Sequence, residues 1–115
     1  MTLEELRNQI DVLDRQLVEL LSERARVVQR IGHLKVAASL AVYEPAREQV
    51  VYANVRAANK GPLPDIELIR LFERIVDVMR SLEMHEAALE KNALAVAPGH
   101  GTGAETSASE TGNRQ

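Results

Sequence analysis

Apolar residues recur over the first part of the chain in alternating steps of three and four, the spacing of one helix face in a heptad pattern. They are Leu3, Leu6, Ile10, Leu13, Leu17, Leu20, Val27, Ile31, Leu34 and Ala38. Thr2 and Glu5 have the spacing of a capping box, in which each side chain binds the backbone of the other residue at a helix start. The pattern therefore predicts one first helix of about 35 to 38 residues.

The length of this helix indicates a partner chain. At 1.5 Å per residue it would be about 55 Å long, whereas a compact body of this mass is about 26 Å across. Residues 4–23 carry mostly acids, and residues 24–43 carry Arg and Lys but no acid. Two copies in antiparallel order would place these opposite charges together, so we expect an antiparallel homodimer.

Two further helices are predicted. Pro45 favours a first helical position, and the segment 59–62, Asn-Lys-Gly-Pro, is typical of a helix end, so a helix is expected from 45 to about 59. Apolar residues from Leu68 to Leu89 recur at helical spacing and predict a third helix from about 64 to 91. Strand signals are missing from residues 1–92, so the predicted class is all-α, with three helices in each subunit.

The composition changes near residue 92. Residues 93–115 are rich in Ala, Gly, Ser and Thr, a composition that buries too little apolar surface to offset its ordering entropy. We therefore expect a helical domain over 1–92 and a disordered tail over 93–115.

Composition and charge exclude several classes of function. The 115 residues carry a formal net charge of -3, which disfavours a nonspecific nucleic-acid binder. The chain contains no cysteine, so it has neither disulfides nor thiolate metal ligands. No apolar run approaches the roughly 20 residues of a membrane span, and the first residues do not resemble a secretory signal. A cytoplasmic protein without membrane contact is expected.

Cationic residues on the apolar face of the first helix are the main chemical signal. Arg24 stands where a heptad seam would place an apolar residue, and Lys35 lies on the same face about 16 Å further along, with Ile31 between them. Gly32 costs about 1 kcal/mol relative to Ala within a helix, which indicates that another backbone or a ligand approaches closely there. An anion would compensate such charges. The plainer alternative is an ion pair between Arg24 and an acid of a partner helix.

Other charged residues are ambiguous when taken alone. Glu44, Arg47 and Glu48 surround the start of the second helix, where a Glu is often only a partner of the helix dipole and an Arg a surface charge. Glu83 follows the apolar face of the third helix and, in isolation, would be an exposed charge.

Metal and cofactor motifs find little support. His85 and Glu86 begin like a zinc-protease helix, but Leu89 stands where the second histidine ligand is required. His33 has no partner at ligand spacing, and Met79 fits a core position better than a ligand. A glycine-rich phosphate loop is missing as well.

Four segments in order resemble the helical class of chorismate mutases, also called type II. They are LRNQIDVLDRQLVELLSERARVVQRIGHLK, VYEPAREQVV, NKGPL and LIRLFERIVDVMRSLE. The resemblance covers residues 3 to about 90. It implies an intertwined homodimer of three-helix subunits with shared active sites, and conversion of chorismate to prephenate in phenylalanine and tyrosine biosynthesis. It implies neither cofactor nor metal, and it leaves open a complex with another aromatic-pathway enzyme.

The resemblance also implies roles for cationic residues. Arg7 and Arg24 would bind the substrate carboxylates, and Arg7 would come from the second subunit, because 17 residues of helix separate the two by about 25 Å. Lys35 would hold a carboxylate and the ether oxygen. Arg47 would lie against the enolpyruvyl side chain, and Glu48 would bind the ring hydroxyl.

Five other positions complete the implied site. The backbone near Glu44 would help to bind the ring hydroxyl, while Ile31 and Val76 would form apolar walls. Met79 stands where some members have a small or hydroxyl residue that touches a carboxylate. Glu83 stands where many members have Gln donating to the ether oxygen, so it must be protonated to help, and our hypothesis is that burial favours this neutral form.

Two alternatives remain at this level. A related lyase of the same fold removes pyruvate from isochorismate, although the segments VYEPAREQ and NKGPL favour the mutase. A noncatalytic helical dimer is the other, but a scaffold would gain seam packing by replacing Arg24 with Leu.

Overall fold

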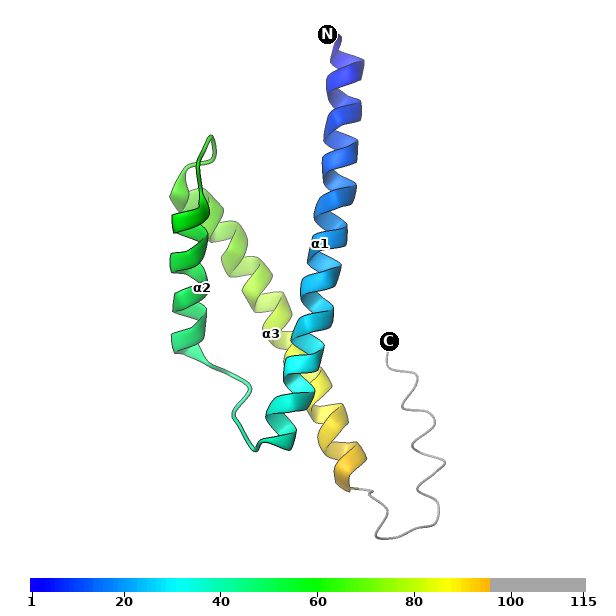
Figure 1. Ribbon diagram of the computed structural model, residues 1–115, viewed down its shortest axis with the longest axis vertical. Helices are drawn as coiled ribbons and strands as arrows, with labels where there is room; N and C mark the ends of the chain where they lie inside the picture. The colour runs from blue at the N-terminus through cyan, green and yellow to red at the C-terminus, as the bar shows by residue number, and fades with distance from the viewer. Residues whose placement is uncertain (96–115) are drawn as a thin grey trace.

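In the computed structural model, residues 1–95 are described, and they form three helices and no strand (Figure 1). The helices are α1 (Leu3–Ala37), α2 (Pro45–Ala58) and α3 (Asp65–Ala95). The all-α class, the three helices and the long first helix are therefore confirmed.

The start of α1 has the predicted capping box. The backbone N–H of Glu5 donates to Thr2 Oγ1 at 3.0 Å, and the backbone N–H of Thr2 donates to Glu5 Oε1 at 2.8 Å. The helix ends where Ser39 takes a positive φ of 59° and the chain turns toward α2. Residues 1–95 contain no helix long and apolar enough to cross a membrane.

The turn between α2 and α3 is organised by Asn59. Its Nδ2 donates to the carbonyl of Leu63 at 2.9 Å and to Asp65 Oδ1 at 2.6 Å, and its Oδ1 accepts from the backbone N–H of Gly61 at 3.0 Å. Gly61 has a φ of 79°, a conformation that glycine adopts without the steric cost a side chain adds. The predicted stop after α2 is thus a compact turn held by one side chain.

Helix α3 is the central element, because it packs against both α1 and α2 (Figure 1). The buried apolar residues of the described chain all lie on α3: Ile69, Val76, Met79 and Ala87. The helix continues through Ala93, Leu94 and Ala95, three residues into the expected tail, because Ala and Leu are strong helix formers. The rest of the expected tail, 96–115, lies outside the described residues.

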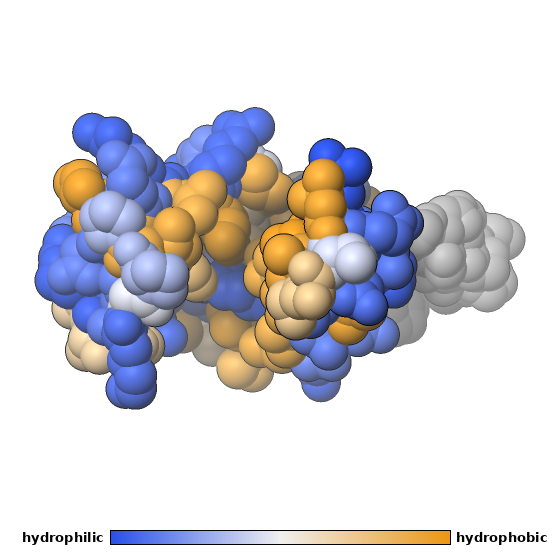
Figure 2. Space-filling view, turned by 90° about the horizontal axis from the view of Figure 1, so that it is seen from above, coloured by the Kyte–Doolittle hydropathy of each residue, from blue (hydrophilic) through white to orange (hydrophobic). Residues whose placement is uncertain are grey.

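The N-terminal half of α1 extends beyond α2 and α3 (Figure 1). Its predicted seam residues are between 43% and 62% exposed, and apolar side chains gather around this end of the molecule in Figure 2. They are Leu3, Leu6, Ile10, Leu13, Leu17 and Leu20. Below we call these six residues the apolar stripe. A single chain leaves the stripe uncovered.

Candidate active site

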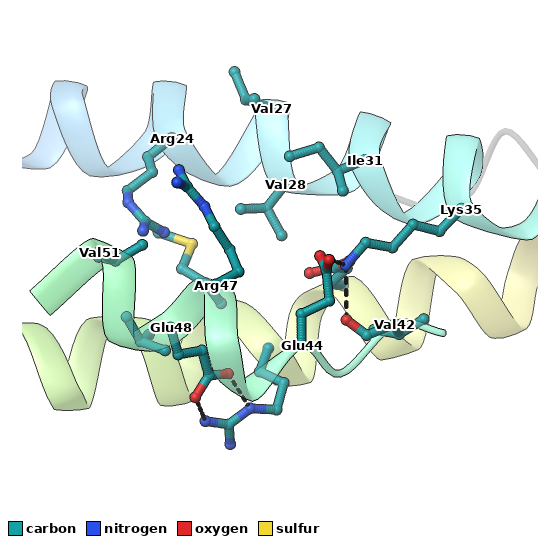
Figure 3. A pocket seen from close by; sticks show the side chains of 14 residues that line it. Arg24, Val27, Val28, Ile31, Lys35, Val42, Glu44, Arg47, Glu48 and Val51 are labelled. Carbon is teal, nitrogen blue, oxygen red and sulfur yellow. Dashed lines mark hydrogen bonds and ion pairs between the residues drawn. The ribbon is translucent and has the colours of Figure 1, made fainter. Parts of the chain in front are cut away.

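All three helices contribute to one pocket of about 330 Å³ (Figure 3). Most of the predicted site residues line it: Arg24, Ile31, Lys35, Glu44, Arg47, Glu48, Val76, Met79 and Glu83. Sequence reasoning missed five lining residues, namely Val27, Val28, Val42, Val51 and Arg80.

Lys35 is the most enclosed cation of the pocket, with 8% of its surface exposed. Its Nζ donates to the carbonyl of Val42 at 2.7 Å and lies 2.8 Å from Glu44 Oε1 and 2.7 Å from Glu83 Oε2. Burial acts to lower the pKa of Lys35, but the contacts with Glu44 and Glu83 outweigh it and raise the pKa above its ordinary value of 10.5. Lys35 is therefore a permanent ammonium in the neutral range.

The two carboxylates on Lys35 differ in exposure. Glu44 is half exposed, and its pKa is lowered from 4.5 by the hydrogen bond and the charge of Lys35. Oε2 of Glu83 is shielded from solvent and close to the ammonium, yet it is not aligned for a hydrogen bond and has no other hydrogen-bond partner among residues 1–95. The ion pair with Lys35 is thus the contact that places this buried oxygen at the pocket.

Gly32 explains how Glu83 comes so close to Lys35. A Cβ at Gly32 would lie 3.0 Å from the backbone carbonyl oxygen of Glu83 and 3.4 Å from its Cγ. The predicted close approach of another backbone is therefore confirmed, and that backbone belongs to α3. The glycine lets α1 and α3 cross with Lys35 and Glu83 on the same side of the contact.

On the other side of the crossing, His33 of α1 contacts two glutamates of α3. Its Nδ1 lies 2.7 Å from Glu90 Oε1 and its Nε2 lies 3.0 Å from Glu86 Oε1. Glu86 is only 4% exposed and also accepts from Gln29 Nε2 at 2.9 Å. The partners of His33 thus lie on α3 and could not be inferred from the sequence of α1. Within residues 1–95 no cluster suited to a metal ion is found.

Glu48 is held by a residue that the sequence analysis did not single out. Arg80 donates from Nε to Glu48 Oε2 and from Nη2 to Glu48 Oε1, both at 2.8 Å. These hydrogen bonds come first among the causes that raise the pKa of Arg80 above its ordinary value. A signal was available, because position 80 is four residues after Val76 and three before Glu83, which places it on the same helix face.

Arg24 and Arg47 project toward the pocket from α1 and α2 (Figure 3). Lys35 and Arg80 are paired with carboxylates, whereas within the described chain neither Arg24 nor Arg47 is in an ion pair. A guanidinium binds a carboxylate through two parallel hydrogen bonds. The pocket therefore presents two available guanidinium groups, which suit a small ligand with two carboxylates.

Arg7 is the one predicted site residue that a single chain does not bring to the pocket. It lies on the N-terminal half of α1, exposed beside the apolar stripe. About 25 Å of rigid helix separates it from Arg24. Within one chain the two arginines cannot bind the same small ligand.

Comparison with known proteins agrees with this geometry. The family "Chorismate mutase type II" matches residues 6–84. The solved structure of chorismate mutase (form II) from Thermus thermophilus is 40% identical in sequence, with a TM-score of 0.69 over 70% of this chain and 92% of that one.

Similar curated proteins are mostly longer. The bifunctional chorismate mutase/prephenate dehydratase of Aquifex aeolicus is 33% identical over 76% of this chain but only 29% of its own length, and that of Neisseria gonorrhoeae is 42% identical over 67% and 21%. This chain therefore spans less than a third of these relatives. The chorismate mutase of Methanocaldococcus jannaschii, 26% identical, is matched over 80% of this chain and 87% of its own length.

Proposed function

The chain belongs to the chorismate mutase type II family, and we propose that it converts chorismate to prephenate in phenylalanine and tyrosine biosynthesis. The observation that carries the proposal is the convergence of Arg24, Arg47 and Lys35 on one pocket, with both guanidinium groups unpaired among residues 1–95. Chorismate is a small dicarboxylate, and this charge pattern fits it.

The reaction is a one-step [3,3] rearrangement with no covalent intermediate. The protein has to hold a flexible dianion in its reactive conformer and to stabilise the negative charge that builds on the ether oxygen as its C–O bond breaks. Arg24 binds a carboxylate, Arg47 lies against the enolpyruvyl group, and Lys35 contacts a carboxylate and the ether oxygen. Ile31 and Val76 form apolar walls that keep water from the reacting bonds.

The carboxylates of the pocket take the remaining roles. Glu48 and the backbone near Glu44 bind the ring hydroxyl. Glu83 donates to the ether oxygen when it is protonated, because an ionised carboxylate has no proton to give. Met79 lines the pocket at the position where some members have a small or hydroxyl residue that touches a carboxylate, so one carboxylate is bound with one hydrogen bond fewer.

We further propose that the active unit is an intertwined antiparallel homodimer with shared sites. The exposed apolar stripe supports it, because long contiguous apolar faces on monomers are rare. The charge asymmetry of α1 favours the antiparallel order. In this arrangement Arg7 of the partner subunit reaches the pocket and completes the carboxylate site. The cytoplasmic location and the complex with another enzyme of the pathway stay predictions.

The test is product identification from purified protein. Wild type is expected to give prephenate from chorismate, and Arg24→Ala to lose about a hundredfold or more in kcat/KM, the scale of removing one charged partner. Pyruvate and salicylate from isochorismate would instead indicate the lyase. Turnover of neither substrate would leave a helical binding module.

Mixing two inactive variants tests the shared site. Arg7→Ala and Arg24→Ala homodimers each lack a residue in both pockets. A heterodimer has one intact pocket, so subunit exchange in an equal mixture should restore about a quarter of wild-type activity. No recovery after exchange would refute the partner origin of Arg7.

A further inference from the structure

Arg80 lines the pocket and is held by several polar contacts, yet the proposed reaction gives it no role. Besides its two hydrogen bonds to Glu48, its Nη1 donates to Asp77 Oδ1 at 3.0 Å. Its guanidinium carbon lies 5.1 Å from the ring centroid of Tyr43, a cation–π distance. Arg80 is thus fixed by its own helix, by α2 and by the segment before α2.

The ion pairs within the pocket leave two guanidinium groups without a carboxylate partner among residues 1–95. Glu44 and Glu83 pair with Lys35, and Glu48 pairs with Arg80. The four cationic side chains that line the pocket therefore face three carboxylates, and the two that stay unpaired within residues 1–95 are Arg24 and Arg47. These are the groups that a dianion needs.

Glu48 would compete for these two guanidinium groups if Arg80 did not hold its carboxylate. It follows Arg47 directly in the first turn of α2, and it borders the same pocket as Arg24. Figure 3 shows its carboxylate turned away from both arginines, toward the guanidinium below it. A carboxylate released from that contact would be drawn to the nearest unpaired guanidinium and would compete with the ligand for it.

We propose that Arg80 is a positioning residue, which holds Glu48 against α3 and so keeps Arg24 and Arg47 available to the substrate carboxylates. The inference rests on the proposed function for its kinetic consequence, but its structural consequence is independent of it. Each oxygen of Glu48 accepts one hydrogen bond from Arg80 and retains a second lone pair, so the same contact leaves Glu48 able to accept from the ring hydroxyl.

The kinetic test compares wild type with Arg80→Met, which keeps a long side chain over Tyr43 but removes the charge. KM for chorismate should rise about ten- to hundredfold, because the competing Glu48 weakens substrate binding, while kcat should change less than about threefold. Arg80→Lys should recover part of the affinity, since it keeps a cation beside Glu48 but cannot form the two parallel hydrogen bonds of the guanidinium. A loss of folded protein alone would lower apparent kcat and leave KM unchanged.

Two further variants isolate the contact. In a Glu48→Gln background, Arg80→Met should add less than about a threefold change in KM, because a neutral amide does not compete for the arginines. Arg74→Met is the matched control: it makes the same charge change on α3, at a side chain that is 78% exposed and whose ion-pair partner among residues 1–95 is Asp77, at 3.6 Å. Its KM should equal that of wild type.

A crystal structure of Arg80→Met gives the outcome that does not depend on activity. The Glu48 carboxylate should move to within about 4 Å of the guanidinium of Arg24 or Arg47. Unchanged placement of Glu48, or a wild-type KM in the folded variant, would overturn the proposal. If wild type converts no chorismate, the proposed function fails, and the position of Glu48 still decides the role of Arg80. Should Arg80→Met not fold, Arg80→Gln carries both measurements with the same expected results.

Discussion

Gly32→Ala sets two effects of comparable size against each other. Alanine is favoured over glycine inside a helix by about 1 kcal/mol, so the substitution alone would stabilise α1. The new Cβ, however, would lie 3.0 Å from the Glu83 carbonyl oxygen, 3.4 Å from Glu83 Cγ and 3.5 Å from Glu86 Cβ. Ordinary C···O contacts lie at about 3.3 to 3.6 Å, so α3 would have to retreat by a few tenths of an ångström.

The retreat cannot be made by one flexible side chain. The nearest atom is a backbone carbonyl within a helix, and the contacts of Lys35 with Glu83 and of His33 with Glu86 hold α3 on both sides of Gly32. Overpacking a fixed contact costs about 1 to 3 kcal/mol, and the middle of this range is larger than the gain in helix propensity. We therefore expect Gly32→Ala to lower the free energy of unfolding by about 1 kcal/mol and to move Glu83 away from Lys35.

Urea denaturation at one protein concentration measures the stability change, and kcat/KM for chorismate measures the displacement of the site. Ala53→Gly on the exposed face of α2 is the control, because it reports the propensity difference without a crowded neighbour. A Gly32→Ala protein that is more stable by the full propensity difference, with wild-type kcat/KM, would refute the close crossing as the reason for the glycine.

The remaining predictions concern the two glutamates beside Lys35. Glu83→Gln supplies an amide N–H that can donate to the ether oxygen without a proton on a carboxylate, so the variant should keep or raise kcat/KM at neutral pH, and a large loss would remove the donor role from this position. Because the pKa of Glu44 is lowered from 4.5, its pairing stabilises the fold above that pH and the stabilisation is lost as pH falls through the lowered value. Unfolding by urea from about pH 7 to 3 should therefore show a smaller acid loss in Glu44→Gln than in wild type, and parallel curves would contradict this.

The fold was predictable because its signals are local. The heptad spacing and the capping box at Thr2 and Glu5 define α1 within a few residues of its observed ends. The end of α2 was predicted from Gly61, and the structure adds only that Asn59 organises the turn. The boundary at residue 92 rested on composition alone, and composition could not show that Ala93, Leu94 and Ala95 would continue α3.

The site was predictable only where a charge stood out against an apolar face. Arg24 did so because it interrupts the seam of α1, and Lys35 did so because it lies on the same helix face as Arg24. Gly32 stood out because glycine is costly in a helix. Arg80 did not, because arginine on a helix is ordinary until its partner Glu48, 32 residues earlier, is known. His33 was missed for the same reason, since its partners lie on α3.

The crossing of α1 and α3 at Gly32 positions part of the pocket, because Lys35 and Glu83 meet beside it. Two contacts flank this crossing: Lys35 pairs with Glu83 on one side, and His33 contacts Glu86 on the other. About two helical turns before Glu83, α3 places Val76 in the wall of the same pocket. Toward its N-terminus the same α1 extends away from α3, and there it carries the exposed apolar stripe and Arg7. The half of α1 that shapes the pocket therefore packs within the chain, whereas the half that bears Arg7 is exposed in a single chain. In the homodimer that we propose, the second copy would bury this half, so assembly of the carboxylate site would be linked to dimer formation.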